Sequence, residues 1–142
     1  MSGRALTLLL GGARVKPAPQ PRPKYLGRSI AEQIGWLPTD VRLAIYLRDG
    51  GACVYCGVGV ELGVRLALDH VVPSDLMGSD EPSNLVTCCT VCNSQKRNLT
   101  LRTYVQHLND YGRNTDGLIE KVEAALARPL PLQAARKLLK RR

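Results

Sequence analysis

Two Cys-x-x-Cys pairs constrain this chain more than any other feature of its sequence. Cys53 and Cys56 form the first pair, and Cys89 and Cys92 form the second, with 32 residues between Cys56 and Cys89. One tight turn of this spacing presents two thiolates, so two such turns complete the tetrahedral set that a structural Zn²⁺ needs. Five cysteines at these spacings argue against an extracellular disulfide framework and favour a metal site in a reducing compartment.

The fifth cysteine, Cys88, lies directly before Cys89. Cys88 could replace Cys89 as the third zinc ligand, but three residues would then separate it from Cys92. We prefer Cys89, whose spacing matches that of the first pair, and expect Cys88 to be packed. The chain has no Phe and one Trp among 142 residues, so its core is short of large side chains. A zinc staple would therefore contribute much of the folding free energy.

The net charge of +8 is carried by the two ends of the chain. Residues 1–28 hold six basic residues and no acid, and residues 128–142 hold another six and no acid. Residues 29–127 hold eight basic and twelve acidic residues, a net charge of −4. This asymmetry predicts flanking arms that contact a polyanion such as nucleic acid. Solvated tails that aid solubility are the alternative.

We divide the chain into a basic, Pro-rich N-terminal arm (1–27), a central domain with flanking helices (28–127) and a basic C-terminal tail (128–142). Alternating prolines favour extended chain in the arm. Ser29 and Glu32 have the spacing of a capping box, which predicts a short helix. In the tail, one helical face suited to phosphates or to water carries Gln133, Arg136, Lys137 and Lys140.

Periodicity and turn residues predict the elements of the central domain. They are, in order, a helix from Thr39 that ends at Asp49, a strand over 64–72 closed by Pro73, a loop over 74–83, a helix from near Cys89 past Lys96, and helices over 100–111 and 115–127. We expect the apolar faces of these helices to be core.

The residues suited to chemistry lie inside or beside the segment that the zinc would close. Asp69 and His70 end the predicted strand, Asn84 follows the loop, and Asn93 follows the second cysteine pair. The other histidine, His107, lies at the edge of a helix face, where we expect a border residue. The four residues other than His107 each have a purely structural alternative, such as a strand-end cap, a core histidine or a turn residue.

Four short motifs follow one another along the central part of the chain. They are Cys53-x-x-Cys56-Gly57, Leu68-Asp69-His70-Val71-x-Pro73, Asn84-Leu85-Val86 and Cys89-x-x-Cys92-Asn93-x-x-Lys96. Over roughly residues 41–102 the chain resembles the HNH endonuclease family in its zinc-bearing form, the ββα-metal nucleases. Two departures are the single Gly78, where related sequences often have a Gly pair, and Asn93, where the family name expects a second His.

The resemblance implies an α+β fold. Its ββα-metal HNH core would be stapled by the four-cysteine zinc site and flanked by helices and basic tails. It also implies a metal-dependent DNA endonuclease that hydrolyses phosphodiester bonds, by nicking or by double-strand cleavage.

The resemblance further implies a role for each of four residues. His70 would be the general base, since a neutral imidazole accepts a proton near physiological pH. Asp69 and Asn93 would hold Mg²⁺ or Mn²⁺ through oxygen atoms. We expect Asn93, in place of His, to weaken metal binding and alter metal preference. Asn84 would brace the loop that carries His70 and orient its imidazole.

Neighbouring strand residues point to opposite faces, so Asp69 and His70 diverge. Opposite directions of these two side chains suit phosphodiester hydrolysis if the phosphate lies between the base and the metal ion. Alternatively, a bulge or bend near Val71–Pro73 would be needed to reorient them. The expected nucleic-acid contacts are Lys96, Arg97, Arg136, Lys137, Lys140 and Arg141. A solvated charged face is the alternative for Lys96 and Arg97.

Two other functions compete with the nuclease: a non-catalytic zinc-finger module that binds nucleic acid, and a zinc-stabilised protein-interaction module. We expect DNA as the partner. No base-reading helix is evident, so sequence specificity is expected to be low or supplied by a protein partner, with genome packaging among the open roles.

The apolar run over 5–10 is short for a signal peptide, and no run reaches transmembrane length. The resemblance implies the cytoplasm of a bacterial or phage-infected cell.

Overall fold

The computed structural model describes residues 37–141. The Pro-rich arm, the helix start at Ser29–Glu32 and Trp36 lie outside the described residues. The elements are α3 (Thr39–Arg48), β1 (Leu66–His70), β2 (Leu85–Cys89), α4 (Thr90–Lys96), α5 (Leu101–Asp110), α6 (Leu118–Ala127) and α7 (Leu132–Lys140), with single 3₁₀ turns at Val60–Leu62, Ser74–Leu76 and Pro82–Asn84.

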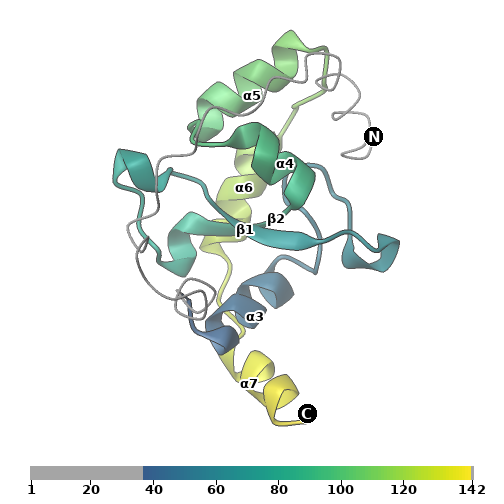
Figure 1. Cartoon of the computed structure of the whole chain (residues 1–142), viewed down its shortest axis with the longest axis vertical. Helices are drawn as coiled ribbons and strands as arrows, with labels where there is room; N and C mark the ends of the chain where they lie inside the picture. The colour runs from purple at the N-terminus through teal and green to yellow at the C-terminus, as the bar shows by residue number, and fades with distance from the viewer. Residues whose placement is uncertain (1–36, 142) are drawn as a thin grey trace.

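Strands β1 and β2 form an antiparallel hairpin at the centre of the described chain, and α4 follows β2 directly (Figure 1). The pairing runs without interruption from Leu66 opposite Cys89 to His70 opposite Leu85. β1 therefore contains no bulge, and the strand ends at His70, before Pro73. This ββα unit with its flanking helices confirms the α+β fold class expected from the sequence.

The hairpin is buried on both faces. Residues directly opposite in an antiparallel pair share a face, so Asp69 and Val86 face one side while His70 and Leu85 face the other. Val86 belongs to the larger core, and Leu85 packs with Ile45 of α3 in a smaller one. All five residues of β2 are consequently buried, which explains why its sequence shows no alternation of apolar and polar residues.

The larger core joins the first Cys-x-x-Cys turn to α5 and α6. Tyr55, from that turn, packs edge-on against Tyr104 of α5, with ring centroids 5.5 Å apart. The buried core residues contributed by α5 and α6 are Tyr104, Leu108, Leu118, Val122 and Ala125. The apolar faces predicted for these two helices are therefore confirmed as core.

Helix boundaries follow local chain chemistry. α3 starts at Thr39, as predicted, and its last residue is Arg48, directly before the predicted end at Asp49, with Ala44 and Ile45 buried. α4 ends at Lys96, earlier than expected, because Arg97 adopts a positive φ of 54° that an α-helix does not accept. Within residues 37–141 no helix has the length and apolar character needed to cross a bilayer.

The basic C-terminal segment forms helix α7, which packs against α3 (Figure 1). Ala135 is fully buried, while Arg136 pairs with Asp40 of α3 at 2.9 Å between Nε and Oδ2. The hydrogen bond from Arg136 lowers the pKa of Asp40. Lys137 and Lys140 remain exposed, so α7 keeps only part of the basic face that its sequence predicts for external contacts.

A buried Arg48–Asp49 pair covers the outer edge of β2. The Arg48 guanidinium donates to the carbonyl oxygens of Pro82 and Leu85, at 3.0 and 2.7 Å, and pairs with Asp49 at 2.8 Å. Asp49 in turn accepts the backbone N–H of Thr87 at 2.8 Å. The pair thus satisfies backbone groups that an uncovered strand edge would leave unpaired.

We expect Asp49→Ala to destabilise the protein strongly, by about 3 kcal/mol, because it leaves the Arg48 charge and the Thr87 N–H buried without their partner. Chemical denaturation followed by circular dichroism measures this change. Asp116→Ala, at an exposed position before α6, is the control and should cost at most about 0.5 kcal/mol. Equal effects of the two substitutions would contradict the assigned role of Asp49.

Candidate metal centre and catalytic strand

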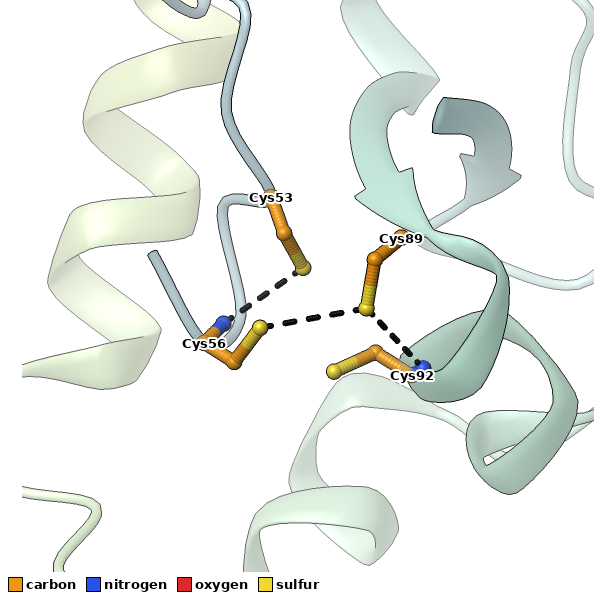
Figure 2. A group of neighbouring side chains, drawn as sticks. All are labelled: Cys53, Cys56, Cys89 and Cys92. Carbon is orange, nitrogen blue, oxygen red and sulfur yellow. Dashed lines mark hydrogen bonds between the residues drawn. The ribbon is translucent and has the colours of Figure 1, made fainter. Parts of the chain in front are cut away.

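The four cysteines of the two Cys-x-x-Cys pairs meet at one point (Figure 2). All four sulfurs lie within 4.8 Å of one another, and Cys56 Sγ is 3.8 Å from Cys89 Sγ. A tetrahedron with Zn–S bonds of ~2.3 Å has sulfurs roughly 3.8 Å apart. The cluster therefore has the size and donor set to hold a metal ion such as zinc.

Both turns are built in the same way. The backbone N–H of Cys56 donates to Cys53 Sγ at 3.4 Å, and that of Cys92 donates to Cys89 Sγ at 3.3 Å. Gly57, at a φ of 81°, closes the first turn with a hydrogen bond to the Cys53 carbonyl. The second turn spans the end of β2 and the first turn of α4, so the cluster fixes the helix start to the hairpin.

The four thiols alter one another's pKa. Hydrogen bonding with Cys53 lowers the pKa of Cys56 and lowers the pKa of Cys89 to about 6. Hydrogen bonding with neighbouring sulfurs raises the pKa of Cys53 and of Cys92. Four negative charges cannot gather here without a cation, and a divalent metal would stabilise all four thiolates. The donor set therefore fits the zinc that the sequence predicts.

Cys88 lies outside this cluster, as expected. It is fully buried, and its sulfur contacts the carbonyl oxygen of Ala67 at 3.7 Å. Burial raises the pKa of its thiol, which keeps Cys88 protonated. It is a packed core residue.

Asp69 points into the larger core. Only 4% of its surface is exposed. Its Oδ2 accepts a hydrogen bond from the Tyr55 hydroxyl at 2.5 Å and lies 3.0 Å from Lys96 Nζ. Burial raises the pKa of Asp69, and the Lys96 charge opposes that shift. Since Tyr55 sits between Cys53 and Cys56, this carboxylate links the first cysteine turn to the end of β1.

The side chain of Lys96 differs from its sequence-based assignment as a phosphate contact. It is fully buried, and its ammonium also donates to the carbonyl oxygen of His70 at 3.0 Å. A lysine on a short helix looks solvent-facing in sequence, but here protein oxygens surround its charge. Lys96 therefore holds the Asp69–His70 pair from inside rather than contacting a phosphate.

His70 lies at the end of β1 with its side chain 15% exposed. Its Nε2 is 2.9 Å from Oδ1 of Asp80, whose side chain is 30% exposed. The sequence does not point to Asp80, because this residue lies in a segment whose composition indicates only turns. His107, the border residue of the sequence analysis, is half-buried and packs against Tyr111.

Asn84 joins the two ends of the loop that follows His70. Its Oδ1 accepts the N–H of Val72 at 2.9 Å, and its Nδ2 donates to the carbonyls of Val72 and Ser79 at 3.0 and 2.9 Å. Gly78 packs against the same point, where a Cβ would lie 1.7 Å from the Val72 carbonyl oxygen. The single glycine of this loop is thus required by a close backbone approach.

The remaining predicted residues lie on helices or just beyond them. Asn93 is half-buried on α4, which packs against β1, one turn before Lys96 and on the same side of the helix. Arg97 is half-buried, and its Nε has no hydrogen-bond partner among the described residues. Lys137, Lys140 and Arg141 are exposed at the C-terminal end of α7. Among residues 37–141, the four cysteines are the only group of three or more His, Cys, Asp or Glu residues arranged to hold a metal.

Comparison with known proteins agrees with this arrangement. The model of the HNH endonuclease family matches residues 53–99. This segment contains both cysteine turns and the hairpin, and the match confirms the resemblance drawn from the motifs. No curated protein matches the chain.

Among solved structures, the chain is similar to the Type II-C Cas9 enzyme from Actinomyces naeslundii, at 24% sequence identity and a TM-score of 0.42. The alignment covers 68% of this chain and 12% of that enzyme. The chain thus spans about an eighth of the length of the Cas9 enzyme.

We expect Lys96→Met to destabilise the protein by about 3 kcal/mol, although methionine fits an apolar site, because Asp69 is left as a buried charge without its cation. Denaturation midpoints measure the loss. The double variant Asp69→Asn with Lys96→Met removes both charges and should recover part of it. A double variant no more stable than Lys96→Met would contradict this account.

Proposed function

We propose that this chain is a metal-dependent DNA endonuclease that hydrolyses phosphodiester bonds, with a structural Zn²⁺ in the four-cysteine cluster. The observation that carries the proposal is the pairing of a partly exposed imidazole with a buried carboxylate at the end of β1, within the HNH segment. The imidazole lies within reach of solvent, whereas the carboxylate is held from inside by Lys96.

His70 is the proposed general base. A neutral imidazole at the edge of the hairpin takes the proton from the water that attacks phosphorus. Its position is set by the ladder to β2 and by the hydrogen bond from Lys96 to its carbonyl oxygen. Because β1 has no bulge, His70 and Asp69 leave opposite faces of the strand, and the phosphate has to lie across the end of the strand.

Asp69 and Asn93 are the proposed ligands of the catalytic cation. Carboxylate and amide oxygens suit Mg²⁺ or Mn²⁺, which when bound would neutralise charge that develops on the phosphate. Tyr55 and Lys96 both contact Oδ2 of Asp69. No described residue donates to Oδ1, and we assign that atom to the cation.

Asn84 is the proposed brace of the catalytic loop. Its amide satisfies the backbone of Val72 on one side of the loop and of Ser79 on the other. A side chain that bridges two backbone segments in this way fixes their separation, so it holds the chain on either side of the turn after His70 in place. This role is indirect, since the Asn84 amide bonds to backbone rather than to the imidazole.

Basic residues supply the proposed DNA contacts. Arg97 follows α4, and Lys137, Lys140 and Arg141 are exposed on and after α7. Such side chains bind phosphates without reading sequence. Specificity would then be low or would come from a protein partner. Arg136 contributes less, because Asp40 already pairs with it.

Zinc content tests the structural site. We expect one Zn²⁺ per chain in the wild type, and we expect Cys53→Ala to lose it together with most of the folded structure, because zinc binding and folding are linked. Elemental analysis and circular dichroism measure both. Cys88→Ala is the matched control, a buried cysteine outside the cluster, and should keep its zinc. Zinc retained by Cys53→Ala would show that the cluster is not the site.

Plasmid nicking in Mg²⁺ or Mn²⁺ tests the catalytic proposal. We expect His70→Ala to lower the nicking rate at least ~100-fold with zinc content unchanged, since a general base contributes about that much or more. His107→Ala, at the only other histidine, should nick at the wild-type rate. If the wild type binds DNA but nicks none in either metal, the chain is instead a non-catalytic zinc module that binds nucleic acid.

A further inference from the structure

We infer that Asp80 is a positioning residue for His70, which orients the imidazole and makes Nδ1 the nitrogen that accepts the proton. The inference deepens the proposed function and rests on it. It starts from the contact between His70 Nε2 and Asp80 Oδ1, at 2.9 Å.

The contact determines the tautomer of the ring. An ionised carboxylate only accepts hydrogen bonds, so the proton between the two groups belongs to Nε2. A neutral imidazole carries one N–H, and its lone pair is then on Nδ1. If Nδ1 carried the proton instead, two lone pairs would face each other across 2.9 Å. Asp80 thereby selects the ring form in which Nδ1 is the base.

The backbone around Asp80 is fixed from both sides by one residue. Asn84 donates through its side chain to the carbonyl of Ser79, at 2.9 Å, and through its backbone N–H to the carbonyl of Glu81, at 2.8 Å. Asp80 lies between these two carbonyls. The brace proposed for Asn84 thus acts on the partner of the imidazole, which is the path by which a buried amide can orient a ring that it does not touch.

Asp80 is placed to orient the His70 imidazole rather than to stabilise the fold. The ladder to Leu85 and the hydrogen bond from Lys96 hold the backbone of His70, whereas Asp80 contacts its imidazole. The Asp80 side chain is 30% exposed, and a hydrogen bond at that exposure contributes little to folding. Loss of the Asp80 carboxylate should therefore alter catalysis far more than stability.

Single-turnover nicking by the zinc-loaded chain of 142 residues tests the inference. We expect Asp80→Ala to slow the chemical step by about 10- to 100-fold, the usual range for a residue that orients a functional group, with DNA affinity and melting temperature unchanged. Asp80→Asn keeps an acceptor oxygen and should recover part of the rate. Asp75→Ala is the matched control in the same loop, where Asp75 instead bonds to Asn98, and should be close to wild type.

Nitrogen-15 NMR of the imidazoles tests the tautomer without reference to activity. The chain has two histidines, so His107 serves as the internal reference. At alkaline pH we expect the Nε2–H form of His70 in the wild type and in Asp75→Ala, and a mixture of tautomers in Asp80→Ala. A wild type in the Nδ1–H form, or an unchanged His70 spectrum in Asp80→Ala, overturns the inference.

The two proposals fail differently. A wild-type chain that nicks no DNA in Mg²⁺ or Mn²⁺ overturns the nuclease assignment, and the inference with it. A wild-type chain that nicks DNA, with Asp80→Ala at the same single-turnover rate, overturns the inference alone.

Discussion

A buried ammonium group holds the site together. Lys96 Nζ has no access to water and finds its oxygens at Asp69 and at the His70 carbonyl, both at the end of β1. Taking that charge out of water would be costly unless these partners were held in place. The far end of α4 is therefore tied to the strand, while its first turn is tied to the cysteine cluster. A helix of seven residues would be marginal alone, and it is fixed here at both ends.

Much of this architecture is predictable from the chain alone. Cysteine spacing predicts the cluster, and apolar periodicity predicts α3, α5 and α6 close to their observed bounds, because both signals are local. The strand that ends in Asp69 and His70 follows from an apolar run and a proline. These elements depend on residues near one another in sequence, where spacing translates directly into geometry.

Contacts between distant segments were not predictable in the same way. Arg48 binds the carbonyl of Leu85, 37 residues away, and the Tyr55 hydroxyl reaches Asp69, 14 residues away. Neither contact has a periodic signature. The sequence predicts a phosphate contact at Lys96, since lysine usually lies at the surface, and only the tertiary packing reveals its burial. Asp80 is not predictable either, because an acidic residue in a turn-rich segment usually faces solvent and nothing in the sequence indicates its contact with His70.

The glycine that packs against the Val72 carbonyl constrains how this domain can vary. Where two backbone segments cross so closely, the loop from His70 to Asn84 has little room to change length or bulk. The turn at Val60–Leu62, between the first cysteine pair and β1, differs: its side chains are exposed, and Gly63 directly after it meets open space. Natural insertions or engineered fusions should therefore be accommodated at that turn, leaving the geometry around the imidazole undisturbed.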